Sequence, residues 1–192
     1  LSLAAKPDSP FKNLQDLLAF AKDNPGKLSY GSPGPGSLPH LAMEQFLNNT
    51  GVDIKHVPFK GDGPGATALM GGHIDLYMAI FSVAADKELD TIALFSDERM
   101  ASMPDLATAK EQGVDMTAAW WGGVVAPQGI PDEARESLNQ ACLATSKSSR
   151  FQDRLSTLGS TVRYKGPEDF RTLVDEVSAV NSKLISKVLK AK

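Results

Sequence analysis

The chain has 192 residues, a formal net charge of −3, 42% hydrophobic residues and 22% charged residues, a composition typical of a folded globular protein rather than a disordered one. The acidic balance and the lack of Lys/Arg clusters argue against nucleic-acid binding. No apolar run approaches the roughly 20 residues that a membrane-spanning helix needs. The single cysteine, Cys142, excludes an internal disulfide and a paired-cysteine metal or redox site.

Helix and strand patterns alternate from the start of the chain. Asn13 opens a capping-box pattern, and the leucines after it predict a helix that ends before Pro25. Residues 27–32 have the pattern of a short strand. The next helix is predicted to begin after Ser37 and to end at Gly51, because serine is a favoured N-cap and glycine a favoured C-cap.

The same order then repeats. We predict a strand over 52–59, a second Gly-rich loop over 60–65, a short helix over 66–72, and strands over 74–81 and 90–96. This alternation indicates an α/β domain with a largely parallel sheet. Ligands of such sheets bind at the carboxyl ends of the strands, where both Gly-rich loops are expected.

The second half of the chain has a different pattern. Residues 116–127 are predicted to form a strand that is buried on both faces. Helices are predicted over 132–149 and 150–158, and a short strand over 161–166. A long helix with an apolar stripe is predicted to begin at Pro167.

The first Gly-rich segment, YGSPGPGSLPH over 30–40, is a candidate anion site. A P-loop needs lysine and then serine or threonine after its last glycine, where this chain has Ser37 and Leu38. A dinucleotide fingerprint needs a third glycine, where this chain has Pro39. What remains is a flexible backbone before a helix N-terminus, which suits a carboxylate as well as a phosphate. A connector without any ligand explains this loop alone equally well.

The second Gly-rich segment, KGDGPGAT over 60–67, favours a ligand, because two such turns would converge at one edge of the sheet. Thr67 is expected in the first turn of its helix, as a cap or as a donor to the ligand. Lys60 would add positive charge, although an exposed lysine at a strand end is usually only solvated.

Candidates for catalysis are few. Cys142 lies in a helical pattern with no nearby histidine and is interpreted as a packing residue. The three histidines, His40, His56 and His73, share no metal-ligand spacing, so neither a metal nor a cofactor is predicted. His40 is interpreted as a packing or hydrogen-bonding residue, and Asp75 as one that satisfies local backbone. No nucleophile, base and oxyanion site come together, and no enzyme is predicted.

Four segments occur in a characteristic order: 30–40, 56–76, 120–141 and 154–174. The first fits the pattern Tyr-Gly-Ser-x-Gly-x-Gly-Ser/Thr-x-x-His. The second fits His-Val-Pro-aromatic-Lys-Gly followed by Gly-Gly-x-Val/Ile-Asp. The ordered set resembles the solute-binding receptors of tripartite tricarboxylate transporters, the Bug-type periplasmic proteins.

The resemblance implies a periplasmic-binding-protein-like (type II) fold of the α/β class, with two lobes that close on a small organic acid. The expected parts are a crossing strand over 1–7, a second lobe with the ligand loops over 8–94, and the remaining part of the first lobe over 95–192. The ligand would be a dicarboxylate, tricarboxylate or aromatic carboxylate, captured in the periplasm after signal-peptide removal and delivered to integral-membrane transporter subunits. The expected ligand-binding residues are Tyr30, Ser32, Gly34, Gly36, Ser37, Lys60, Gly63, Thr67 and Ala79.

Two departures from the family pattern are visible. Family members carry an earlier strand and a Pro-Gly-Gly loop that forms the other carboxylate clamp. We therefore expect this chain to be a fragment, or to be completed by another chain. Met78, Ala79 and Ile80 stand where many relatives have Phe-Asp-Asn, which disfavours an amino-acid ligand. Two alternatives stay open: an α/β enzyme that uses the loop as a phosphate or oxyanion site with His40 as base, and a carboxylate-sensing signalling domain.

Overall fold

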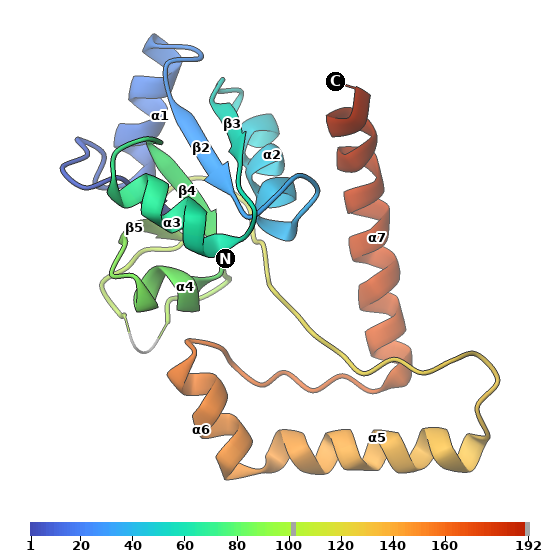
Figure 1. Ribbon diagram of the computed structural model, residues 1–192. Helices are drawn as coiled ribbons and strands as arrows, with labels where there is room; N and C mark the ends of the chain where they lie inside the picture. Colours follow the sequence, from blue (N-terminus) through green and yellow to red (C-terminus); the bar gives the residue numbers. More distant parts are fainter. Residues whose placement is uncertain (101–102, 191–192) are drawn as a thin grey trace. The chain divides into compact units, whose positions relative to one another are not determined.

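The computed structural model of the protein describes residues 1–100 and 103–190 (Figure 1). The chain forms two compact units. The first contains Leu1–Trp120 together with the end of the chain from Leu184, and the second contains Trp121–Lys183. The sheet and both Gly-rich segments belong to the first unit.

A five-stranded sheet forms the centre of the first unit. In spatial order its strands are β3 (Lys55–Pro58), β2 (Ser29–Ser32), β4 (Leu76–Ala79), β1 (Ser2–Ala5) and β5 (Asp90–Leu94). β2 runs parallel to β3 and β4, whereas β1 runs antiparallel to β4 and β5. The largely parallel α/β sheet is thus confirmed, with the first strand of the chain inserted in the opposite direction.

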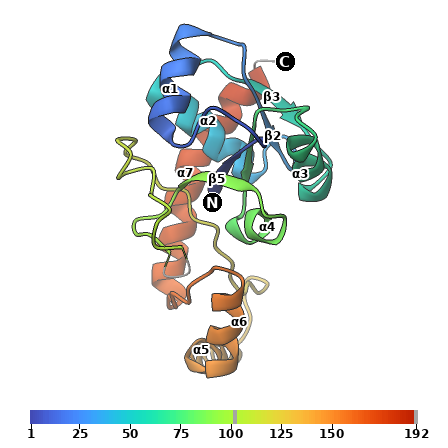
Figure 2. The same cartoon turned by 90° about the vertical axis from the view of Figure 1, so that its left-hand side faces the viewer.

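Helices cover both faces of this sheet. They are α1 (Leu14–Asp23), α2 (Leu38–Thr50), α3 (Asp62–Met70) and α4 (Phe81–Asp86). Figure 2 shows α1 and α2 on one face and α3 and α4 on the other. The predicted limits of the first two helices are confirmed, because Asn13 and Ser37 accept backbone hydrogen bonds as N-caps and Gly51 ends α2 in the left-handed conformation.

Alternation along the strands divides the core between the two faces. On β4, Leu76 and Met78 pack with α1 and α2, whereas Tyr77 and Ala79 pack with α3. The larger cluster also contains Leu3, Leu14, Leu17, Tyr30, Met43, Phe46 and Phe95, all of them buried. Burial on both faces explains why the β4 sequence has no polar alternation.

Asp75 joins three strands at the end of the sheet opposite the Gly-rich loops. Its carboxylate accepts hydrogen bonds from Lys6 Nζ at 2.7 Å and from the backbone N and the Oγ of Ser29 at 2.9 and 3.0 Å. Burial works to raise the pKa of Asp75, but these donors outweigh it and hold the pKa below its ordinary value. The predicted structural role of this residue is confirmed.

Two local features of the first unit differ from the prediction. α3 already begins at Asp62, so Gly63, Pro64 and Gly65 belong to its first turn rather than to a loop. Proline and glycine are tolerated there because the first helical N–H groups have no intrahelical acceptor. The short helix α4 was not predicted, because its residues were assigned to the preceding strand and to a connection.

The second unit is helical. It contains α5 (Asp132–Lys147), α6 (Ser149–Thr157) and most of α7 (Pro167–Lys190), which confirms the three predicted helices. The predicted strands over 116–127 and 161–166 are wrong, because neither segment forms a strand. Ala118 makes single backbone hydrogen bonds with Leu1 and Phe95, but no ladder follows from them. Within 121–183, the only described side chain that is buried belongs to Ser146, so this unit has no apolar core of its own.

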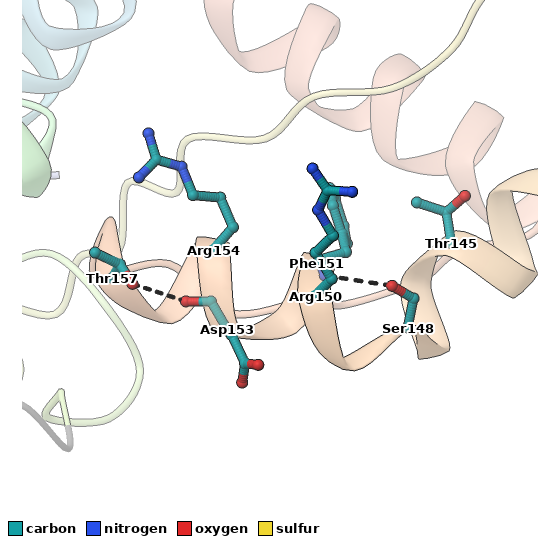
Figure 3. Close-up of a pocket in the computed structure, with 7 residues that line it drawn as sticks. All are labelled: Thr145, Ser148, Arg150, Phe151, Asp153, Arg154 and Thr157. Carbon is teal, nitrogen blue, oxygen red and sulfur yellow. Dashed lines mark hydrogen bonds between the residues drawn. The ribbon is translucent and has the colours of Figure 1, made fainter.

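The corner between α5 and α6 lines an open hollow of about 630 Å³. Arg150 and Arg154 lie one turn apart on α6 and extend to the same side, whereas Asp153 points away from them (Figure 3). The other lining residues are Thr145, Ser148, Phe151 and Thr157. None of them belongs to a Gly-rich loop, and the hollow is not part of the candidate site.

Candidate ligand-binding site

The two Gly-rich segments meet at one edge of the sheet, as predicted. β2 ends at Ser32 and β3 ends at Pro58, and the connections that follow are joined by backbone hydrogen bonds. Phe59 N donates to Ser32 O and Gly61 N donates to Pro33 O, both at 3.0 Å. The loop before α2 and the loop before α3 therefore form one continuous backbone surface at the carboxyl ends of two parallel strands.

The loop before α2 has a fixed shape that only glycine permits. Gly34 and Gly36 adopt φ values of 152° and 75°. Ser37 caps the helix and also donates from Oγ to Gly34 O at 2.7 Å. Gly36 N donates to Nδ1 of His40 at 2.9 Å, so the helix holds its own entry loop from below.

The N-terminus of α3 has no side-chain cap, whereas the N-terminus of α2 is capped by Ser37. The N-cap residue of α3 is Gly61. A Cβ built on Gly61 or Gly63 would meet no atom within 4 Å, so both backbones border open space. The first N–H groups of this helix have no intrahelical acceptor and carry the positive end of the helix dipole, so they can bind an anion.

The predicted position of Thr67 is wrong, because α3 begins five residues before it. Its hydroxyl donates to Gly63 O at 3.0 Å within the helix and makes no cap. Lys60 is exposed beside the same turn. Of these two candidates, Lys60 is exposed and the Thr67 hydroxyl already has an internal partner.

Three predicted ligand residues lie beneath the loops rather than at their surface. Tyr30, Ser32 and Ala79 have 0% exposure. The Tyr30 hydroxyl donates to Glu44 Oε1 at 2.8 Å, and Ser32 Oγ lies 2.8 Å from Nε2 of His56. The side chains of Tyr30 and Ser32 form the floor beneath the loop before α2, whereas Ala79 packs on the other face of the sheet with Leu69 and Tyr77.

Three aromatic rings stack in that floor. The ring centroids of His40 and His56 are 3.9 Å apart with an interplanar angle of 13°, and the ring of Tyr30 lies 4.8 Å from that of His56. Burial lowers the pKa of His40, an effect that Glu44 opposes. Burial, and then the neighbouring His40, lowers the pKa of His56 to about 4. Both imidazoles are therefore neutral at pH 7.

Sequence reasoning did not find Glu44 or the pairing of the two histidines. A usable signal was present for Glu44, because it lies four residues after His40 on one face of α2. Its Oε1 atom is 3.8 Å from Nε2 of His40. The interpretation of His40 as a hydrogen-bonding residue is confirmed, because it is 2% exposed and its Nδ1 accepts from Gly36. A ring held in this way is not placed to act as a base above the loop.

The site offers backbone donors and little reactive chemistry. Over residues 1–100 and 103–190 no three His, Cys, Asp or Glu side chains group as metal ligands, and no helix there is long and apolar enough to cross a membrane. Asp62, on the first turn of α3, accepts a hydrogen bond from the Tyr77 hydroxyl at 3.0 Å. Backbone donors at an uncapped helix N-terminus are able to hold an anion.

Known proteins are similar to this chain in sequence and in fold. Residues 1–189 match the family model described as the tripartite tricarboxylate transporter family receptor. A UPF0065 protein of Bordetella pertussis is 35% identical over 162 residues, which cover 82% of this chain and 50% of the relative. The chain thus spans about half the length of that curated relative.

Solved structures of related proteins have a similar fold. The structure titled "R. palustris Rpa4515 with adipate" has a TM-score of 0.85 and 29% identity, over 97% of this chain and 64% of that one. MatC from Rhodopseudomonas palustris "with bound malate" has a TM-score of 0.78 and 26% identity, over 97% and 65% of the two chains. The periplasmic-binding-protein-like fold is confirmed, and the chain belongs to the receptor family of the tripartite tricarboxylate transporters.

Proposed function

We propose that this protein captures a small organic acid, a dicarboxylate, tricarboxylate or aromatic carboxylate, and carries no enzymatic activity. The observation that carries the proposal is the pair of hydrogen-bonded Gly-rich loops beside the uncapped N-terminus of α3. Such a surface offers several N–H groups and a partial positive charge to a carboxylate. The adipate and malate named for the two related structures are ligands of that chemistry.

The ligand residues of the proposal fall into two groups. Gly34, Gly36, Ser37 and Gly63 lie in the loops at the edge of the sheet, with Lys60 adding charge. The Gly36 N–H and the Ser37 hydroxyl already have partners within the loop and α2, so the first turn of α3 supplies the unpaired N–H donors. Tyr30, Ser32 and Ala79, together with Thr67, shape and support that edge from within. Affinity then depends on the geometry of the backbone more than on any one side chain.

Binding can be tested by following the amide resonances of the protein during titration with adipate, malate, citrate and benzoate. We expect the amides of Gly36 and Gly63 to shift, and Gly63→Ala to weaken binding about tenfold, since a Cβ there enters the open space that the ligand would fill. Thr50→Ala, at the far end of α2, is the matched control and should leave affinity unchanged. Binding of a nucleotide or a sugar phosphate in place of every carboxylate would overturn the proposal.

We further propose that the receptor works in the periplasm, delivers its ligand to integral-membrane transporter subunits, and is completed by polypeptide beyond residues 1–192 or by another chain. Its second unit supports this. Trp121 and Phe170 stack edge to face there, yet no described apolar side chain of 121–183 is buried. Apolar surface left in water forgoes about 25 cal/mol per Å², so a covering partner stabilises this unit.

Amide hydrogen exchange tests whether the second unit lacks a covering partner. In the 192-residue chain we expect the amides of α5 and α6 to exchange at least a hundredfold faster than those of β4, because helices without a core open locally at little cost. The amides of α2, in the same sample, serve as the protected reference. Equal protection of α5 and β4 would show that the second unit needs no partner.

A further inference from the structure

The stacked pair of His40, in α2, and His56, in β3, contacts the loop before α2. Nδ1 of His40 accepts the hydrogen bond of Gly36 N at 2.9 Å, and Nε2 of His56 lies 2.8 Å from Ser32 Oγ. Gly36 is in the middle of the loop and Ser32 at its start. Each imidazole thus contacts one point of the loop, and His40 is buried whereas His56 is half-buried.

The hydrogen bond from Gly36 fixes the charge that His40 can carry. A backbone N–H can only donate, so Nδ1 of His40 must be unprotonated and its proton must sit on Nε2, which faces Glu44 at 3.8 Å. If Nδ1 were protonated, its N–H and the N–H of Gly36 would both be donors, and the hydrogen bond between them would be lost. The loop is therefore held in this shape only by a neutral His40.

Few charged groups surround the pair. From α2 it faces Glu44, which also accepts the Tyr30 hydroxyl of β2 at 2.8 Å, and from β3 the two rings face each other. Glu44 is the counter-charge of His40 alone, since the groups that contact His56 are Tyr30, Ser32 and His40. Two imidazolium rings 3.9 Å apart would repel, so protonation of one ring opposes protonation of the other.

Resting on the carboxylate-binding role proposed above, we infer that His40 and His56 are positioning residues, that a neutral His40 keeps the anion loop in its binding shape, and that protonation of His40 releases the loop and weakens ligand binding in acid. The predicted sign is diagnostic. A histidine that contacted a carboxylate ligand directly would bind it more tightly when protonated. A histidine that acts through the Gly36 amide does the opposite.

The pKa shifts agree with this direction. Burial lowers the pKa of both rings, that of His56 to about 4, whereas a histidine in the unfolded chain titrates near 6.5. The unfolded chain therefore binds more protons than the folded one between those values. The contribution of the pair to stability is complete above about pH 6.5 and is lost as the pH falls toward 4.

Conservative variants separate positioning from mere packing. In His40→Asn the amide oxygen replaces Nδ1 as an acceptor, and in His56→Gln the amide replaces Nε2, but neither side chain titrates. His73→Asn is the matched control, because His73 is exposed and outside the loop. His40→Ala removes the acceptor altogether.

The first measurement needs no ligand. We expect the exchange protection of the Gly36 amide to fall at least threefold between pH 7 and pH 3.5 relative to the Gly51 amide, which donates to Leu47 O at the other end of α2. His40→Asn should remove this pH dependence, and His73→Asn should retain it. A Gly36 amide whose protection parallels that of Gly51 in the unmodified chain overturns the inference, even if every variant fails to fold.

The second measurement uses adipate as the probe. The ratio of affinities of the unmodified chain and the double variant His40→Asn/His56→Gln should fall at least threefold from pH 7 to pH 3.5; protonation of adipate itself cancels in this ratio. A constant or rising ratio contradicts the inference. Absence of binding by all the carboxylates at pH 7 contradicts the proposed function instead, and the exchange of Gly36 then still decides whether the pair controls the loop.

Discussion

Gly65→Ala should lower the free energy of unfolding by about 2 to 3 kcal/mol. A Cβ at this position would lie 2.2 Å from Cε2 of Tyr77. That ring is fully buried, and its hydroxyl donates to Asp62 at 3.0 Å, so the ring is held in place. Urea unfolding followed by circular dichroism measures the loss.

Gly63→Ala is the matched control for this experiment. It lies in the same turn of α3, but its Cβ would meet no atom within 4 Å. Because alanine is the better helix former, stability should stay the same or rise by up to about 1 kcal/mol. The two variants therefore have opposite profiles, with Gly65→Ala reducing stability and Gly63→Ala reducing ligand affinity. Equal stability of both would refute the close packing of α3 on Tyr77.

Asp75→Ala should cost about 2 to 4 kcal/mol of stability, because three donors from two strands lose one acceptor. Lys6 Nζ and the backbone N–H of Ser29 would remain half-buried without that partner. The low pKa of Asp75 adds a pH dependence. The carboxylate stabilises the fold above the ordinary pKa of about 3.8, and this contribution is lost as the pH falls through the lower folded value.

Lys110→Ala is the comparison for Asp75. The ion pair of Lys110 with Asp97 is 2.8 Å long, close to the 2.7 Å between Lys6 and Asp75, but both of its side chains are at least 40% exposed. Exposed pairs contribute about 0 to 1 kcal/mol. Thermal unfolding of both variants at pH 7 and pH 3 should separate them. A loss for Asp75→Ala no greater than that for Lys110→Ala would mean that Asp75 is not the tie between β1, β2 and β4.

Local signals explain why part of the fold could be predicted. The limits of α1 and α2 depend on Asn13, Ser37 and Gly51, which act on the nearest turn of the chain. The convergence of the two Gly-rich loops also follows from the sequence, because parallel neighbouring strands end at the same edge. These predictions needed only the order of the elements.

Predictions that depended on distant partners were less successful. Residues 116–127 are apolar enough for a strand, but a strand forms only beside another strand, and no local pattern shows whether one is there. The beginning of α3 was hidden for a related reason. Gly63, Pro64 and Gly65 are typical of loops, and only the packing of Gly65 on Tyr77 makes glycine necessary inside the helix.

The candidate site divides in the same way. The positions of Gly34, Gly36 and Ser37 follow from turn chemistry and were predicted. The support of the loop by His56 was not predicted, because it lies 24 residues away from Ser32 along the chain. A residue on a neighbouring strand is identified as a support only when the register of that strand is known.

The central, antiparallel position of β1 governs how the chain can fold. β1 is the first strand in the sequence, yet its neighbours in the sheet are Leu76–Ala79 and Asp90–Leu94. Residues 2–5 therefore cannot pair on both sides until the chain has been synthesised beyond Leu94. Pairing over such a sequence separation makes folding slow, because a long loop must close before any contact compensates for its lost entropy. A ribosome-bound chain shorter than this has an incomplete sheet, in which β1 lacks its partner β5.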